Sequence, residues 1–145
     1  MKEKITCLLF GMAALLASAQ TDANWTVKHH NKVILRSDAE DAVRNTIPVQ
    51  LSDLNNKGSF IITYHDRRNA KDLRNWVRSV AFFTEADSVL FSKKSSIVRV
   101  ADTALKKMLQ KNRVVKVYTW AIPKDPVQAA RVRIRRVHLC TFELN

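Results

Sequence analysis

The sequence predicts an all-β, mainly antiparallel sandwich of two layers, built as a single domain. Three observations favour this fold. Val, Ile, Phe, Trp, Tyr and Thr recur in short runs, and clusters of Asn, Asp, Lys and Ser separate these runs. The chain has 145 residues, of which 46% are hydrophobic. A chain of this length and composition can build one hydrophobic core and little more. A clear helical period occurs only over residues 102–111.

The N-terminus has the three parts of a secretory signal peptide. Two lysines give a positive start, residues 5–16 are apolar, and Ala-Ser-Ala follows at residues 17–19. The apolar run is shorter than the ~20 residues that a membrane-spanning helix needs, although a short buried helix is the alternative. We therefore expect a signal peptide over residues 1–19 and an exported domain over residues 20–145. The periplasm or the outside of a bacterial cell is the expected location, with no transmembrane segment after cleavage.

Seven short segments before residue 101 are expected to be strands, since each is rich in β-branched or aromatic residues. They are residues 25–28, 32–36, 47–51, 59–64, 76–84, 88–91 and 96–100. Residues 29–31, His-His-Asn, are predicted as the hairpin turn between the first two strands, because Asn tolerates a positive φ. Pro48 places its strand at a sheet edge, since proline has no N–H to donate.

The connections between these strands differ in how clearly they are marked. Residues 55–58, Asn-Asn-Lys-Gly, are the strongest turn signal in the chain. Residues 85–87 are expected to close a second hairpin. Residues 37–40 have capping-box spacing, so the segment that follows is either a turn or two of helix or a polar loop. Residues 67–71 are predicted as a charged loop.

The helix over residues 102–111 is expected to cross one end of the sandwich as a lid. Asp102 is the predicted N-cap, and Leu105, Met108 and Leu109 recur at helical spacing. A strand is then expected over residues 113–122. Two further segments complete the prediction, a stiff corner over residues 123–126 and a last strand over residues 131–144.

Seven to nine short strands in one domain of this size are typical of a two-layer sandwich, and an immunoglobulin-like arrangement is the preferred form. A half-open β-barrel is the alternative. The Cys-Trp-Cys signature of antibody domains is absent, so the likeness concerns architecture alone and does not indicate a function.

A ladder of three arginines is the most specific functional signal. Arg131, Arg133 and Arg135 alternate with apolar residues, so on a strand their guanidinium groups would leave one face about 6.5–7 Å apart. Arginine pairs in two places at once with phosphate, sulfate or carboxylate. The chain also carries a net charge of +12. We therefore predict these three residues as ligand-binding, with a solvated face that protects an edge strand as the alternative.

The direction of the side chains after this ladder is left open. Strict alternation turns Arg136 and His138 inward together with Cys140. A β-bulge at residues 135–136 turns Val137 and Leu139 inward instead. A central strand covered on both faces would accommodate either phase.

Other chemistry is weakly marked. His29, His30, His65 and His138 lack the spacings typical of zinc or copper sites, so no metal is predicted. No hydrolase motif or phosphate-binding loop occurs, and no cofactor is expected. Cys140 is interpreted as a buried structural thiol, the only cysteine after the signal peptide. Five aromatic residues are interpreted as core, with a sugar-stacking platform as the alternative. They are Trp25, Tyr64, Trp76, Tyr118 and Trp120.

These features favour an exported, non-catalytic binding module over an enzyme. The expected partner is an anionic glycan, a lipid head group or another envelope protein, since nucleic acid is not expected in this compartment. The alternative is an accessory, chaperone-like protein that binds a polypeptide partner by adding a β-strand. A small secreted enzyme is a third class. The ligand and the oligomeric state are not specified by the sequence.

Overall fold

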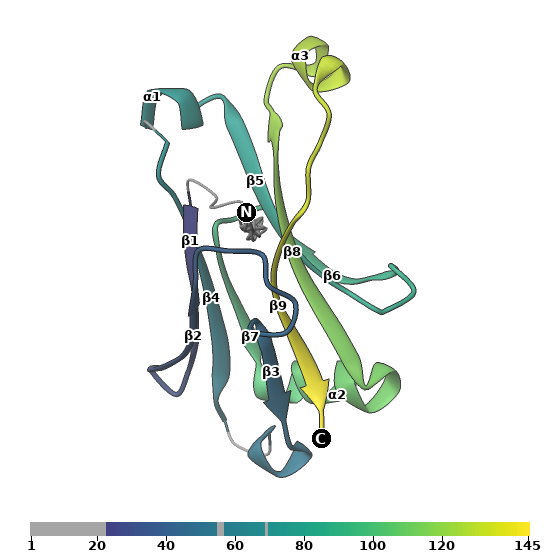
Figure 1. Cartoon of the computed structure of the whole chain (residues 1–145). Helices are drawn as coiled ribbons and strands as arrows, with labels where there is room; N and C mark the ends of the chain where they lie inside the picture. Colours follow the sequence, from purple (N-terminus) through teal and green to yellow (C-terminus); the bar gives the residue numbers. More distant parts are fainter. Residues whose placement is uncertain (1–22, 55–56, 69) are drawn as a thin grey trace, which may run out of the picture.

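The computed structural model describes residues 23–54, 57–68 and 70–145. The predicted signal peptide and its cleavage point lie outside these residues, as does half of the predicted turn at 55–58. Two β-sheets lie face to face, with short helices at the two ends (Figure 1). No helix in the described ranges is long and apolar enough to cross a membrane.

The first sheet has four antiparallel strands in the order β2-β1-β4-β7. They are β1 (Ala23–His29), β2 (Lys32–Ser37), β4 (Ser59–Asp66) and β7 (Ile97–Ala101). The turn between β1 and β2 has a positive φ at His30 (47°) and at Asn31 (63°), which confirms the predicted hairpin. Two consecutive residues of positive φ are typical of the tight turn whose twist matches that of the strands.

The second sheet has five strands in the order β3-β9-β8-β5-β6. They are β3 (Thr46–Val49), β5 (Trp76–Phe83), β6 (Val89–Lys93), β8 (Val114–Pro123) and β9 (Val137–Leu144). All pairs in it are antiparallel except β3 with β9, which run parallel. Pro48 lies in the edge strand β3, as predicted. The all-β sandwich of two layers is thus confirmed, and the seven strands predicted before residue 101 are all present.

The helix predicted over residues 102–111 is confirmed as α2 (Asp102–Asn112). It crosses the end of the sandwich at which the chain ends (Figure 1). Leu105 and Leu109 are fully buried, so they close this end of the core. The predicted cap is wrong, however. Ala101 is the N-cap residue, and the side chain of Asp102 turns away to contact His29.

Three shorter helices were not predicted. They are the 3-10 helix η1 (Leu51–Leu54), α1 (Ala70–Leu73) in the predicted charged loop, and α3 (Pro126–Arg131). Residues 38–45 form a polar loop of turns, which decides between the two alternatives for that segment. Here the carboxylate of Asp41 accepts hydrogen bonds from the N–H groups of Val43 and Arg44.

The last strand is shorter than predicted, and this is a correction. It begins at Val137, whereas residues 131–136 end α3 and then continue without strand pairing. The physical reason is local. Asp125 accepts a hydrogen bond from the N–H of Val127 at 3.0 Å, and Pro126 follows it at the first helical position. An Asp cap followed by proline starts a helix, which replaces the predicted corner.

β9 lies between β3 and β8 and is thus an inner strand of its sheet. Its pairing with β8 passes from Cys140 to His138, so Leu139 is the extra residue of a β-bulge. The bulge therefore lies within β9 and not at residues 135–136, where one of the two alternatives placed it. It allows both Leu139 and Cys140 to be fully buried.

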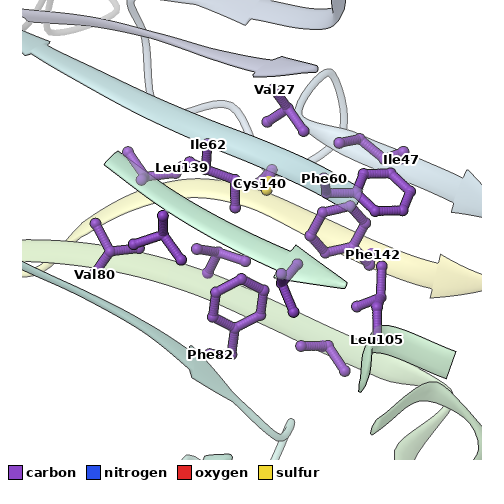
Figure 2. Packing of buried hydrophobic residues seen from close by; sticks show 14 of the residues in the cluster. Val27, Ile47, Phe60, Ile62, Val80, Phe82, Leu105, Leu139, Cys140 and Phe142 are labelled. Atoms are coloured by element: carbon purple, nitrogen blue, oxygen red, sulfur yellow. The ribbon is translucent and has the colours of Figure 1, made fainter. Parts of the chain in front are cut away.

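The core lies between the sheets, and Figure 2 shows side chains of both sheets and of α2 directed toward one another. Phe142 contacts Phe60 of the opposite sheet edge to face, with ring centres 5.1 Å apart. The sheets are also joined by a buried hydrogen bond, from Nε1 of Trp25 to the carbonyl oxygen of Leu139 at 2.7 Å. Trp25 is therefore a core residue, as predicted.

Candidate functional site

The helices α1 and α3 lie at the same end of the sandwich (Figure 1). Residues of this end line a cleft. It consists of two adjoining hollows of about 260 and 330 Å³ that share several lining residues. We call it the arginine–tryptophan cleft, after the side chains that line it. These are Arg68, Arg78, Arg133, Arg135, Trp76 and Trp120.

Asp66, at the end of β4, holds two of the arginines in place. The guanidinium of Arg78 donates to the carboxylate of Asp66 at 3.0 Å and to the hydroxyl of Thr119 at 3.2 Å. Arg68 donates to both oxygens of Asp66, from Nε to Oδ1 at 3.0 Å and from Nη2 to Oδ2 at 2.7 Å. Arg78 also lies over the ring of Tyr64, with its central carbon 4.2 Å from the ring centre. Such contacts fix arginine geometry, because a planar guanidinium can bond at its edge and stack on its face.

The electrostatics of the cleft favour an anion. Partial burial raises the pKa of Asp66, but the hydrogen bonds and charge of Arg68 together with the charge of Arg78 more than offset this, and the pKa lies below its usual value. Burial raises the pKa of Tyr64, against the charge of Arg78, so Tyr64 keeps its proton at neutral pH. Four arginines against two carboxylates, Asp66 and Glu40, leave a surplus of two positive charges.

The structure brings two of the three predicted ladder residues to this cleft. Arg133 and Arg135 line it from the extended segment before β9, and Arg135 forms an ion pair with Glu40. Arg131 ends α3 and does not line the cleft. The ladder therefore does not project from a strand as predicted, since its residues precede β9.

Arg136 and His138 do not enter the core. The guanidinium of Arg136 pairs with Asp87, with bonds of 2.9 and 3.0 Å, and lies 5.0 Å from the ring centres of Phe83 and Tyr118. His138 packs its ring against Tyr118, and its Nε2 lies 2.9 Å from the hydroxyl of Thr141. Burial lowers the pKa of His138.

Sequence reasoning missed Arg68 and Arg78 as parts of one site. It preferred a core role for Trp76 and Trp120, but both are only partly buried and line the cleft, as in the alternative of a sugar-stacking platform. A signal for Arg78 was present, since it lies in phase with Val80 and Phe82, which face the core. A charged residue at an inward position of a strand needs a partner, and Asp66 is that partner. The partner comes from another sheet, so only the fold reveals it.

A second group of polar side chains comes together at the other end of the described structure. His29, His30 and Asp102 place one metal-ligating atom each within 4.8 Å of one another. No spacing in the sequence marks this group, because Asp102 follows the two histidines by more than seventy residues.

Comparison of the chain with protein-family models, with curated proteins and with solved structures gives no match. The interpretation of both sites therefore depends on their own geometry.

Proposed function

We propose that this protein is an exported, non-catalytic binding module that takes an anionic glycan in the arginine–tryptophan cleft. One observation carries this proposal, the convergence of four arginines and two tryptophans from separate segments on one cleft. Arginine holds carboxylate or sulfate groups in two places at once, and the face of a tryptophan ring packs on the apolar face of a sugar. A lipid head group and another envelope protein are the other anionic partners in this class.

Arg133 is the residue best suited to meet the ligand first. It is exposed and forms no ion pair with any residue in the described ranges. Arg68 and Arg78, by contrast, are already held by Asp66. The cleft therefore combines fixed arginines at its wall with a guanidinium whose charge is not neutralised by the protein.

The chemistry of the cleft supports binding without catalysis. Asp66 is the carboxylate that lines both hollows, and it accepts hydrogen bonds from two guanidinium groups. A carboxylate held in this way is a poor proton carrier, because its lowered pKa favours the ionised form.

Export and an immunoglobulin-like arrangement belong to the same proposal. Export to the periplasm or the outside of a bacterial cell rests on the leader over residues 1–19. The strand order β9-β8-β5-β6 corresponds to the G-F-C-C′ order of a variable-type immunoglobulin sheet, which supports that arrangement.

The test compares two variants that lose the same charge. In the first, Arg133 and Arg135 are both replaced by Gln. In the second, Lys107 and Lys111, exposed on α2 at the opposite end, are both replaced by Gln. The measurement is the Kd for a heparin oligosaccharide by calorimetry, with circular dichroism to check that each variant folds.

We expect the arginine variant to lose about tenfold or more in affinity, since each charge-assisted hydrogen bond contributes about 1.5–3 kcal/mol. The lysine variant is expected to lose much less, because only long-range charge changes. A single Arg131→Gln variant should resemble the lysine variant. Equal losses in the arginine and lysine variants would show that overall charge alone binds the glycan, and would refute a site in the cleft.

A second candidate function is strand addition to a polypeptide partner in a chaperone-like role. The edge strand β2 presents Val33 and Ile34 with 41% and 40% of their surface exposed. A hollow of about 330 Å³ between β2 and β3 is lined by apolar residues of both edges, among them Leu35 and Ile47. Salt separates the two functions, because glycan binding weakens steeply as salt rises and main-chain pairing does not.

A further inference from the structure

The group formed by His29, His30 and Asp102 lies at the other end of β1 from the cleft. Ala23 lines the cleft and His29 ends the same strand, so the two sites are separated by about 20 Å of extended chain. Nε2 of His29 lies 3.0 and 3.1 Å from the two carboxylate oxygens of Asp102. Nε2 of His30 lies 3.9 Å from one of them.

The turn between β1 and β2 makes this arrangement possible. Neighbouring residues on a strand point to opposite faces. The positive φ of His30 turns the chain, however, and the two imidazole rings lie with their centres 4.1 Å apart. The ring of His29 is fixed from its other side by Phe60, at 4.0 Å and nearly parallel to it.

Asp102 is held equally firmly. It is fully buried at the start of α2, and its N–H donates to the carbonyl of Gly58 at 3.0 Å. Gly58 itself lies against the group. A Cβ at this position would stand 2.4 Å from the ring of His30 and 2.6 Å from the carboxylate of Asp102. Only glycine leaves room for the imidazole and the carboxylate to approach each other here.

We propose that His29, His30 and Asp102 bind one divalent transition-metal ion, for which Zn²⁺ is the probe. Two imidazole nitrogens and one carboxylate are a ligand set that Zn²⁺ and Fe²⁺ take in proteins. Ligand atoms about 2.0–2.1 Å from a tetrahedral ion are about 3.3 Å apart. Oδ2 of Asp102 lies 3.1 Å from Nε2 of His29 and 3.9 Å from Nε2 of His30, and these separations lie on either side of that value. The side chain of His30 is 51% exposed, so a fourth position faces solvent and is open to water or a ligand.

A purely structural role does not account for the whole group. The bond between His29 and Asp102 alone would tie the hairpin to α2. That role needs only His29, and it leaves unexplained why Nε2 of His30 lies 3.9 Å from the same carboxylate. A second imidazole beside a fully buried carboxylate is better explained by an ion that both residues bind.

The test is a Zn²⁺ titration of the purified protein by calorimetry, in a buffer without chelators, with His30→Asn as the main variant. Asn suits the positive φ of this turn, so the variant keeps the hairpin and removes one ligand. His65→Ala is the matched control, since His65 is exposed on β4 and outside the group. Circular dichroism checks that all three proteins fold.

We expect one Zn²⁺ per wild-type chain, a loss of affinity of about tenfold or more in His30→Asn, and no loss in His65→Ala. Imidazole nitrogen NMR should show Zn²⁺ shifting His29 and His30 but neither His65 nor His138. Absence of stoichiometric binding by the wild type, or equal binding by His30→Asn, would overturn the proposal. Neither result bears on the cleft, because the two sites share no residue.

Discussion

Replacing Trp25 by Phe is expected to destabilise the protein because it removes the buried hydrogen bond between the two sheets. The indole N–H donates to the carbonyl oxygen of Leu139, the extra residue of the bulge in β9. Phe fills most of the same space but has no donor. The carbonyl then stays buried without its side-chain partner.

The expected loss in the free energy of unfolding is the sum of two contributions. A buried acceptor that loses its partner costs about 1–3 kcal/mol. The smaller ring leaves a partial cavity at a fully buried position, which costs about 1–2 kcal/mol more. We therefore expect the free energy of unfolding to fall by about 2–5 kcal/mol, and Tm to fall by on the order of 10 °C.

The assay is urea unfolding followed by circular dichroism, since the substitution removes a fluorescent residue. Trp120→Phe is the matched control, because Trp120 is only partly buried and lines the cleft. It should cost less than about 1 kcal/mol. If Trp25→Phe costs no more than Trp120→Phe, the bond between the sheets does not contribute as argued.

Three further predictions concern other positions. Burial raises the pKa of the Cys140 thiol, so a thiol reagent should label it slowly until denaturant is added, and fast labelling of the native protein would contradict its place in the core. The folded pKa of Asp66 is lowered, so its ionised form stabilises the fold fully above the unfolded pKa of about 3.9. The free energy of unfolding of wild type should therefore exceed that of Asp66→Asn by its full amount at pH 7. This difference should be lost as pH falls through the folded pKa of Asp66. A pH-independent difference in urea unfolding would count against this. Mass spectrometry of the exported protein should find Gln20, or its pyroglutamate, as the first residue, whereas a soluble exported form that retains Met1 would exclude the signal peptide.

Local patterns were sufficient to predict most of the fold. The turn at residues 29–31 and the helical spacing of Leu105 and Leu109 depend on neighbours in the sequence, and both are present. The last strand begins six residues later than predicted, because the Asp125–Pro126 start of a helix outweighs the alternation after Arg131. Periodicity alone does not separate an extended segment from a paired strand.

The two candidate sites could be predicted only in part, and for one physical reason. Arg133 and Arg135 were visible as a basic cluster, but Arg78 and Asp66 belong to different sheets and meet only when the sandwich closes. His29 and Asp102 likewise meet across the end of the sandwich. Contacts between residues far apart in the sequence leave no spacing to recognise.

The parallel pair of β3 and β9 has a consequence for how the molecule is made. Thr46 pairs with Thr141, and β9 lies inside its sheet between β3 and β8. After β3 has been synthesised, nearly a hundred more residues must follow before the strand with which it pairs is complete. Pairing between residues so far apart in the sequence is slow, because closing the loop between them costs conformational entropy before the stabilising contacts form. Until Leu144 leaves the ribosome, the five-stranded sheet therefore lacks the strand that joins β3 to β8.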